Sequence, residues 1–283
     1  MTETPTTAQM LSTEGLCKSF GGLRAVHNLN FHVDDGEIVA IIGPNGSGKT
    51  TFFNLIMQLY DVTSGSIYLG PERREIVGLP THRINALGIS RTFQTLRLFT
   101  NLTVLENVLV GMNRHLSTNY WSALVRPESL RLEEKEAEER ALDTLSFFGE
   151  RLLSMCNEPA HSLSYANRRR LEIARVLASD PKLILLDEPV AGMNPTETRE
   201  VMSDIERINE SGYTVLLIEH DMTLVRGVAG RVVAFDHGQK IAEGSFDHVC
   251  SDPEVIEAYL GRQSNHAKKR PRTARKRSRR RSS

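Results

Sequence analysis

The feature that most constrains this chain is a glycine-rich stretch at residues 43–50, GPNGSGKT, which fits the pattern G-x-x-x-x-G-K-[ST] and is followed directly by Thr51. Backbone N–H groups can surround a phosphate only where no side chain intervenes, and glycine meets that condition. Lys49 adds a positive charge at the β- and γ-phosphates, and the hydroxyl of Thr50 is suited to Mg²⁺. The predicted nucleotide-binding residues here are Gly43, Pro44, Asn45, Gly46, Ser47, Gly48, Lys49, Thr50 and Thr51.

The stretch lies between a predicted strand and a predicted helix, as this mechanism requires. Residues 37–42 (EIVAII) have the composition of a buried strand. Residues 51–60 carry apolar side chains at helical spacing, namely Phe53, Leu55, Ile56 and Leu59. The helix would direct the positive end of its dipole toward the nucleotide.

A second strand, residues 183–188 (LILLDE), ends in two adjacent carboxylates. Successive residues at a strand end point in different directions, so the two groups can have different roles. We expect Asp187 to reach the coordination shell of Mg²⁺. We expect Glu188 to face the γ-phosphate and to orient or deprotonate a water molecule.

Two further polar residues follow predicted strands. Gln94 comes after residues 89–93 and has an amide able to bind Mg²⁺ or water, while His220 comes after residues 214–218 and could donate to the γ-phosphate. Alternation of strands and helices predicts a mainly parallel sheet with the nucleotide at the carboxyl ends of its strands. Asp187, Glu188 and these two residues would then meet at one edge.

The pattern along the chain suggests one folded domain at residues 12–262, preceded by a disordered lead-in at residues 1–11 and followed by a basic, disordered tail at residues 263–283. The domain would begin with an antiparallel pair of strands turning at Gly21-Gly22. Residues 96–179 are predicted to form an inserted helical layer. One apolar face in that layer is formed by Ala137, Ala141, Leu145 and Phe148.

Composition limits the possible locations and partners. No apolar run approaches the ~20 residues that span a bilayer, and the opening MTETPTTAQM lacks the apolar core of a secretory signal. The three cysteines are scattered and odd in number, which favours neither a disulfide framework nor a metal site. These observations predict a protein that stays in the cytoplasm, peripheral to any membrane.

Charge is distributed unevenly along the chain. Ten of the 35 basic residues lie within residues 268–281, which contain no acidic residue, so the remainder has 25 basic against 35 acidic residues, a net charge near −10. The tail is either a solvated segment without function or an electrostatic attachment to an anionic membrane surface. Nucleic acid would attract it by the same physics and is the less favoured partner.

Taken together, these motifs resemble those of the ATP-binding-cassette (ABC) ATPases. They follow the family order: Phe20, residues 43–50, Gln94, the signature-like residues 163–167 (LSYAN), Asp187-Glu188, residues 191–194 (AGMN) and His220. The resemblance implies an α/β P-loop NTPase core with a mainly parallel sheet, an N-terminal antiparallel β layer and an inserted helical subdomain. It also implies that Phe20 stacks on adenine, and that Ser164, Ala166 and Asn167 cap the ATP held by a second ATPase subunit.

Individual sequence segments, such as RRRLEIARVLASDPKLILLDEP, are similar to those of the ATPase subunits of branched-chain amino-acid importers. That resemblance implies ATP and Mg²⁺ as cofactors, a homo- or heterodimer of ATPase subunits, and membrane permease subunits that residues 96–103 would contact. Three alternatives remain open: a urea or amide importer ATPase, a soluble ABC ATPase acting on nucleic acid or ribosomes, and a catalytically impaired regulatory subunit.

Two departures from the family pattern affect the expected turnover. The family signature usually ends in Gly-Gln, where this chain has Ala166-Asn167. A methyl group at position 166 would weaken capping if the backbone there needs a positive φ. The aspartate common in the later loop is replaced by Asn194.

Overall fold

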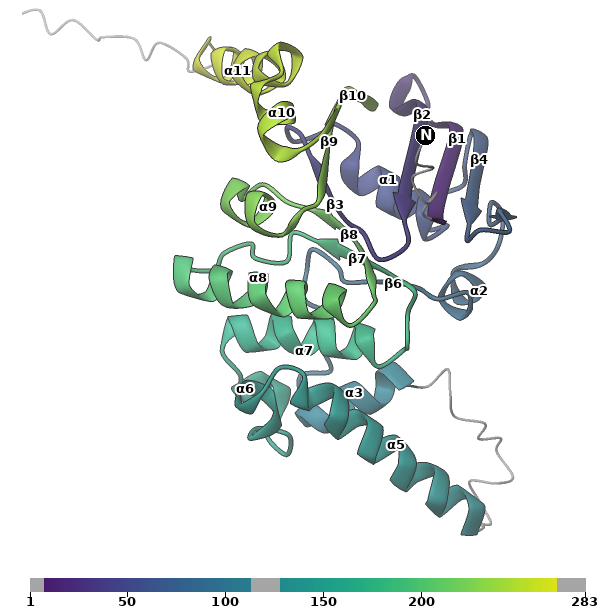
Figure 1. Cartoon of the computed structure of the whole chain (residues 1–283), viewed down its shortest axis with the longest axis vertical. Helices are drawn as coiled ribbons and strands as arrows, with labels where there is room; N and C mark the ends of the chain where they lie inside the picture. Colours follow the sequence, from purple (N-terminus) through teal and green to yellow (C-terminus); the bar gives the residue numbers. More distant parts are fainter. Residues whose placement is uncertain (1–7, 113–127, 269–283) are drawn as a thin grey trace, which may run out of the picture.

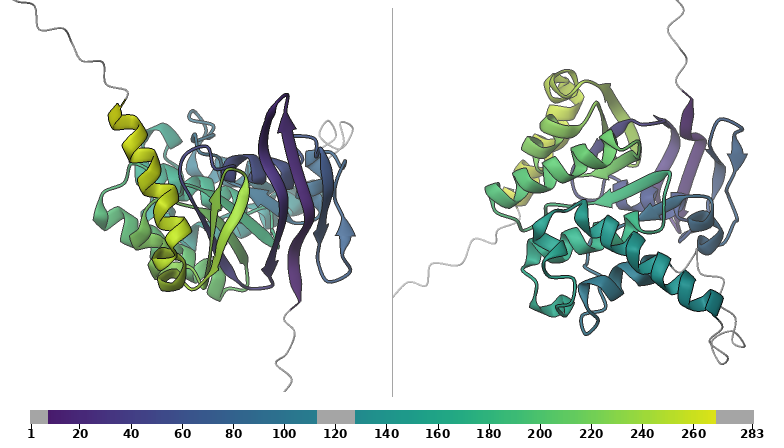
Figure 2. Two further views of the ribbon diagram at one scale, coloured as in Figure 1. Left: turned by 90° about the horizontal axis from the view of Figure 1, so that it is seen from above. Right: turned by 60° about the horizontal axis from the view of Figure 1, so that its bottom comes forward.

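The computed structural model describes residues 8–112 and 128–268 of the chain. Its first layer is an antiparallel sheet in the order β2-β1-β4-β5. The strands are β1 (Gln9–Phe20), β2 (Leu23–Asp34), β4 (Ser64–Leu69) and β5 (Arg74–Glu75). Figure 2 shows β1, β2 and β4 gathered at one side of the molecule. The predicted N-terminal antiparallel layer is therefore present.

The predicted lead-in at residues 1–11 is too long at its C-terminal end, because β1 already begins at Gln9. Leu11 is fully buried, and the carbonyl of Met10 accepts a hydrogen bond from the backbone N–H of Gly70 at 2.9 Å. An apolar side chain buried beside a paired backbone keeps these residues in the sheet. Residues 1–7 lie outside the described residues.

The second sheet has six strands in the order β10-β9-β3-β8-β7-β6. Its strands are β3 (Ile38–Ile42), β6 (Ile89–Arg91), β7 (Leu183–Asp187), β8 (Thr214–Ile218), β9 (Arg231–Asp236) and β10 (Gln239–Gly244). All neighbouring pairs are parallel except β9 and β10, which form a hairpin. The prediction of a mainly parallel sheet is confirmed.

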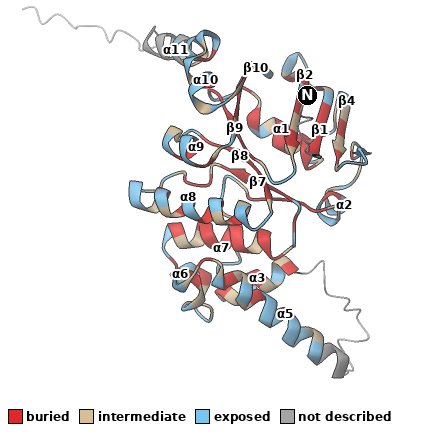
Figure 3. Cartoon of the chain, viewed as in Figure 1, coloured by how far each residue is buried: buried red, intermediate tan, exposed pale blue. Residues whose placement is uncertain are grey.

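Each face of this sheet packs against its own apolar cluster. Alternate residues of β3 divide between them: Ala40 belongs to one cluster, and Val39 and Ile41 belong to the other. Helix α1 (Lys49–Ile56) lies between the two sheets, and Figure 3 shows the parallel strands as almost wholly buried. Strands buried on both faces explain the unbroken apolar runs in the sequence.

The face of the six-stranded sheet that points away from α1 is covered by helices from the predicted insertion and by α8 (Pro195–Glu210) (Figure 1). The insertion contains α3 (Val104–Gly111), α5 (Glu128–Ser146), α6 (Glu150–Leu153) and α7 (Tyr165–Leu177), with a short 3₁₀ turn at Ala160–Ser162. The predicted apolar face of α5 is buried against this cluster. Residues 113–127 of the predicted insertion lie outside the described residues.

The remaining helices are α2 (Thr81–Ala86), α9 (Met222–Val228), α10 (Phe246–Ser251) and α11 (Pro253–Lys268). Helix α11 corrects the predicted boundary of the tail, because it continues past residue 263 to Lys268. Neither proline nor glycine occurs between Gly261 and Pro271, so nothing in the local sequence stops the helix at 263. Within the described residues, no helix combines the length and apolar character needed to cross a bilayer.

Candidate nucleotide-binding site

The glycine-rich loop connects β3 to α1 at the carboxyl edge of the parallel sheet. Gly43 and Gly48 have φ values of 144° and 105°, which side-chain-bearing residues rarely adopt. A Cβ atom on Gly43 would lie 2.2 Å from the carbonyl oxygen of Phe235, and one on Gly48 would lie 2.4 Å from that of Ala25. Glycine is thus needed here for close backbone packing as well as for access to phosphate.

Lys49 lies folded over this loop. Its ammonium donates to the carbonyl oxygens of Gly43 at 2.6 Å and Pro44 at 3.1 Å. The side chain is almost fully buried. A buried ammonium whose two short hydrogen bonds go to neutral carbonyl oxygens is well placed to attract an anion.

A pocket of about 170 Å³ opens beside the loop. The residues that line it are Asn45, Gly46, Gly48, Lys49, Thr50, Thr51, Gln94, Glu188 and His220. The structure therefore brings residues from four distant parts of the sequence together at one edge of the sheet. Gly43, Pro44 and Ser47 are buried and are not part of this lining.

The Glu188 carboxylate contacts two other polar side chains that line the pocket. It lies 3.2 Å from Nε2 of His220 and accepts a hydrogen bond from the amide of Gln94 at 3.4 Å. Glu188 follows β7 with a φ of 49°, in the left-handed region, so its side chain turns away from the direction of the strand. This unusual backbone conformation marks a position that the surrounding structure must hold.

His220 is uncharged at neutral pH. Burial lowers the pKa of His220 below its usual 6.5, the nearby Lys49 ammonium lowers it further, and the Glu188 carboxylate partly offsets both effects. A neutral imidazole donates from one ring nitrogen only. A single N–H on Nε2 would point at the Glu188 carboxylate, 3.2 Å away.

Asp187 is buried behind Glu188, where one of its oxygens accepts a 2.7 Å hydrogen bond from the guanidinium of Arg91. The other oxygen, Oδ1, is buried and has no hydrogen-bond partner among the described residues. An unpaired buried carboxylate oxygen, a threonine hydroxyl and a glutamine side-chain carbonyl are all oxygen donors, the type of ligand that Mg²⁺ prefers. Asp187, Thr50 and Gln94 therefore fit the predicted metal, although Asp187 itself is not part of the pocket lining.

Sequence reasoning missed Arg91, which is 8% exposed and also donates to the side chain of Asn54 at 2.6 Å. The sequence signal for this role was a charged residue, Arg91, inside a predicted strand, since an arginine is almost never fully buried without a partner. The pairing fixes Asp187 and adds a positive charge behind the pocket.

Sequence reasoning also missed Arg169 on α7, which is 1% exposed. Its guanidinium donates to the carbonyl oxygens of Asp187 at 2.9 Å, Glu188 at 2.7 Å and Phe93 at 2.7 Å, and to the carboxylate of Glu172 at 2.7 Å. One side chain thus joins α7 to the backbone that carries Glu188 and to the residue before Gln94. The run RRR predicts a surface charge cluster rather than a buried anchor, so the pattern concealed this role.

Glu219 is a third buried residue that the motifs did not reveal. Its carboxylate accepts backbone N–H groups from Val190 at 3.1 Å, His220 at 2.8 Å and Asp221 at 3.1 Å. Burial raises the pKa of Glu219, and these three N–H groups act against that rise. The carboxylate joins the turn after Glu188 to the turn that presents His220.

The signature-like residues lie apart from this pocket, at the N-terminal end of α7. Ser164 caps the helix by accepting the backbone N–H of Asn167 at 3.3 Å, and the side-chain oxygen of Asn167 accepts from Arg170 at 2.9 Å. Ala166 is helical and 2% exposed, and its φ is not positive. The expected backbone strain at Ala166 is therefore absent.

Phe20 also lies apart from the pocket lining, at the end of β1. Its ring is 42% exposed and packs edge-to-face on Tyr60, with a centroid distance of 5.3 Å. The ammonium of Lys18 lies 4.9 Å from the ring centroid. The exposed ring remains available for stacking.

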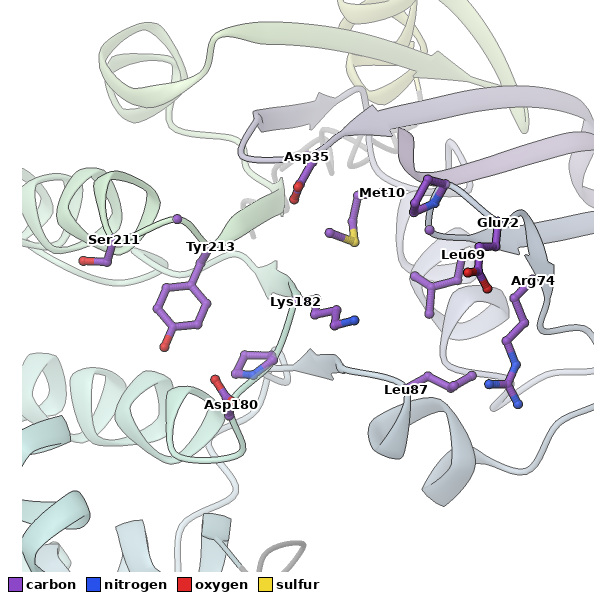
Figure 4. A pocket seen from close by; sticks show the side chains of 14 residues that line it. Met10, Asp35, Leu69, Glu72, Arg74, Leu87, Asp180, Lys182, Ser211 and Tyr213 are labelled. Carbon is purple, nitrogen blue, oxygen red and sulfur yellow. The ribbon is translucent and has the colours of Figure 1, made fainter. Parts of the chain in front are cut away.

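A larger hollow, about 700 Å³, lies at the opposite edge of the sheet (Figure 4). Asp35, Lys182 and Tyr213, which line it, come just before β3, β7 and β8. Ligands of open parallel sheets bind at the carboxyl ends of the strands, and none of the predicted site residues lines this hollow. We therefore place the chemistry in the smaller pocket.

Comparison with known proteins agrees with the geometry. A family model described as ABC transporter matches residues 26–191, and one described as branched-chain amino acid ATP-binding cassette transporter matches residues 239–264. The chain is 44% identical over 253 residues to the high-affinity branched-chain amino acid transport ATP-binding protein LivG of Escherichia coli strain K12, covering 89% of this chain and 98% of LivG. The corresponding protein BraF of Pseudomonas aeruginosa is 43% identical with the same coverage.

Solved structures give the same result. An ATP-binding cassette of an ABC transporter in its ADP conformation superimposes with a TM-score of 0.77 at 33% identity, covering 89% of this chain and 99% of that one. A dimeric bacterial ABC transporter cassette superimposes with a TM-score of 0.70 at 27% identity, covering 84% and 99%. The chain therefore belongs to the ATP-binding proteins of the ABC transporter family, in which LivG and BraF are similar to it.

Proposed function

We propose that the chain binds ATP with Mg²⁺ on the glycine-rich loop and hydrolyses it with Glu188 as the general base. The observation that carries this proposal is the position of the Glu188 carboxylate, which contacts both His220 and Gln94 in the pocket that Lys49 also lines. Glu188 would orient and deprotonate the attacking water. When ATP binds, neutral His220 would turn its one N–H from Glu188 to the γ-phosphate. Thr50, Gln94 and Asp187 would hold Mg²⁺, which supplies charge neutralisation at the phosphates.

A second copy of the chain, or a related ATPase subunit, would complete the site. Ser164, Ala166 and Asn167 lie outside the pocket of their own chain, and Ser164 is exposed at the end of α7. A dimeric cassette among the similar structures supports this arrangement. ATP held between two subunits would favour a closed dimer, and release of phosphate would remove that bias.

The transport proposal concerns branched-chain amino acids, with permease subunits as partners at the cytoplasmic face of the cell membrane. It is supported by near full-length similarity to LivG and BraF. Residues 96–103 would contact the permease, and Phe99 in this stretch is 50% exposed. An exposed aromatic ring is typical of a residue that a partner covers.

The test is uptake of radiolabelled leucine by cells that lack this chain and are complemented with wild type or with Lys49→Ala. We expect wild type to restore uptake and Lys49→Ala, which loses the phosphate-binding ammonium, to fail. Restoration of urea uptake without leucine uptake would favour the urea or amide importer instead. Co-purification with ribosomes rather than permeases would favour the nucleic-acid alternative.

We further propose that the basic tail attaches the protein to anionic membrane surfaces. Each basic residue close to such a surface contributes about 1 kcal/mol. Because α11 extends to Lys268, the informative truncation ends there and leaves the helix intact. We expect the truncated protein to bind ATP normally and to sediment less with phosphatidylserine vesicles at low salt. Equal sedimentation of the two proteins would leave the solvated tail as the better account.

A further inference from the structure

The C-terminal helix α11 contacts the glycine-rich loop directly, through a residue that belongs to none of the motifs above. The hydroxyl of Tyr259 accepts a hydrogen bond from the backbone N–H of Gly43 at 2.8 Å. Tyr259 is partly buried against the main apolar cluster, and Gly43 is buried. The two residues are 216 positions apart in the sequence, so only the folded structure brings them together.

This hydrogen bond satisfies a backbone group at the point where the sheet ends. The pairing of β3 with β9 stops at Ile42 and Ala234, one residue before Gly43. A buried N–H group that loses its partner carries a desolvation cost, so such groups are almost always paired. Tyr259 provides the partner that the sheet no longer supplies.

The same glycine is held at two further points. Its carbonyl oxygen accepts a hydrogen bond from the ammonium of Lys49 at 2.6 Å. Behind it, the carbonyl oxygen of Phe235 lies so close that even a Cβ atom would come within 2.2 Å. The N–H and the carbonyl of Gly43 lie in adjacent peptide units joined at its Cα, so a shift of this residue would move the oxygen that holds the Lys49 ammonium.

We propose that Tyr259 is a positioning residue of the phosphate-binding loop, which fixes the Gly43 peptide and, through its carbonyl, the resting place of Lys49. This inference rests on the proposed role of Lys49 in phosphate binding. With this role for Tyr259, helix α11 contributes to the nucleotide site as well as to the packing of the domain. The role is indirect, since Tyr259 does not line the pocket.

The test is Tyr259→Phe in the full-length chain, which removes the hydroxyl and keeps the ring. We expect the Kd for ATP, measured by isothermal titration calorimetry, to rise by about two- to tenfold, as expected for one lost hydrogen bond to a buried group. The KM of the ATPase should rise by a similar factor with little change in kcat, because Glu188 and Gln94 are unaffected. The control is Tyr213→Phe at the opposite edge of the sheet, which should leave Kd unchanged.

A second variant separates this role from general loosening of the helix. Val255 on α11 is 4% exposed, and its aliphatic side chain cannot hydrogen-bond to Gly43, so Val255→Ala should lower the thermal midpoint and leave the Kd for ATP within about twofold of wild type. An equal rise of Kd in Val255→Ala and Tyr259→Phe would overturn the specific role of the hydroxyl.

Lys49→Ala provides the third arm, and it tests the function on which the inference rests. If Lys49→Ala binds ATP as wild type does, both the proposed phosphate site and the role of Tyr259 fail. If Lys49→Ala loses binding and Tyr259→Phe matches wild type, the phosphate site stands and only the positioning role is overturned.

Discussion

The glycine-rich loop and the signature-like residues 163–167 are held in different ways. The loop is packed on backbone carbonyls of Phe235 and Ala25 and lines the pocket within a single chain. The signature-like residues lie at the start of α7, where Leu163 and Ala166 are buried and Ser164 is an exposed helix cap, and they contribute nothing to the described lining of that pocket. One half of the proposed site is therefore complete in one chain, whereas the other half is proposed to need a second subunit.

A single helix nevertheless connects the two regions. Arg169 follows Asn167 by two residues on α7 and donates to the backbone of Glu188 at 2.7 Å. A displacement of the signature-like residues would therefore be transmitted to Glu188, the proposed general base, in the same chain. The predictions that follow test this connection and the contrast between the two regions.

The largest effect is expected from Arg169→Met. The substitution leaves the buried Glu172 carboxylate and several carbonyl oxygens without their donor, so the free energy of unfolding should fall by about 3–5 kcal/mol. Urea denaturation measures this change. The control is Arg168→Met on the half-buried side of the helix, for which a much smaller loss is expected. Equal losses in both variants would show that the buried arginine does not join α7 to the sheet.

The next largest effect is expected from Gly48→Ala in the loop. A φ of 105° and a contact of 2.4 Å with the Ala25 oxygen both disfavour a side chain, so we expect a loss of about 1–3 kcal/mol in stability and weaker ATP binding. Gly22→Ala is the matched control, because a Cβ atom there would meet nothing within 4 Å. If both variants bind ATP equally well, the close packing behind the loop is not required.

A smaller effect, a gain in ATPase rate rather than a loss of stability, is expected from one substitution in the signature-like residues. Because Ala166 is helical, Ala166→Gly alone should not raise the ATPase rate and should cost about 0.5–1 kcal/mol of stability. Asn167→Gln should raise the rate in the assembled complex by about two- to tenfold, if its longer side chain regains one hydrogen bond across the dimer. A rate increase from Ala166→Gly alone would mean that the bound state needs a different backbone conformation at this residue.

The smallest effect concerns the protonation of His220. Its lowered pKa means that, as the pH falls, the unfolded chain binds a proton before the folded chain does, so the stability present above pH 6.5 decreases below it. NMR titration of the ring should give a midpoint below 6.5, and Lys49→Ala should raise that midpoint because a neighbouring positive charge is removed. A midpoint at or above 6.5 in wild type would contradict the proposed neutral imidazole.

The sequence predicted those parts of the site that follow from local patterns. The glycine-rich loop and the carboxylates at the end of β7 are each encoded within a few neighbouring residues. The capping box of Asn194 and Glu197 at the start of α8 is equally local. Arg169 and Tyr259 act on backbone atoms far away in the sequence, so no local pattern identifies them. The start of β1 and the length of α11 were missed because burial and the absence of helix breakers, rather than composition, determine them.

The central claim is that Glu188 is the general base of a site completed by a second subunit, and Glu188→Gln tests it most directly. The amide can hold the attacking water and cannot take its proton, so ATP should bind and turnover should nearly stop. Size-exclusion chromatography with ATP and Mg²⁺ should then show the variant as a dimer, while the same variant without ATP elutes as a monomer. ATPase activity equal to wild type, together with an unshifted monomer peak, would contradict the account.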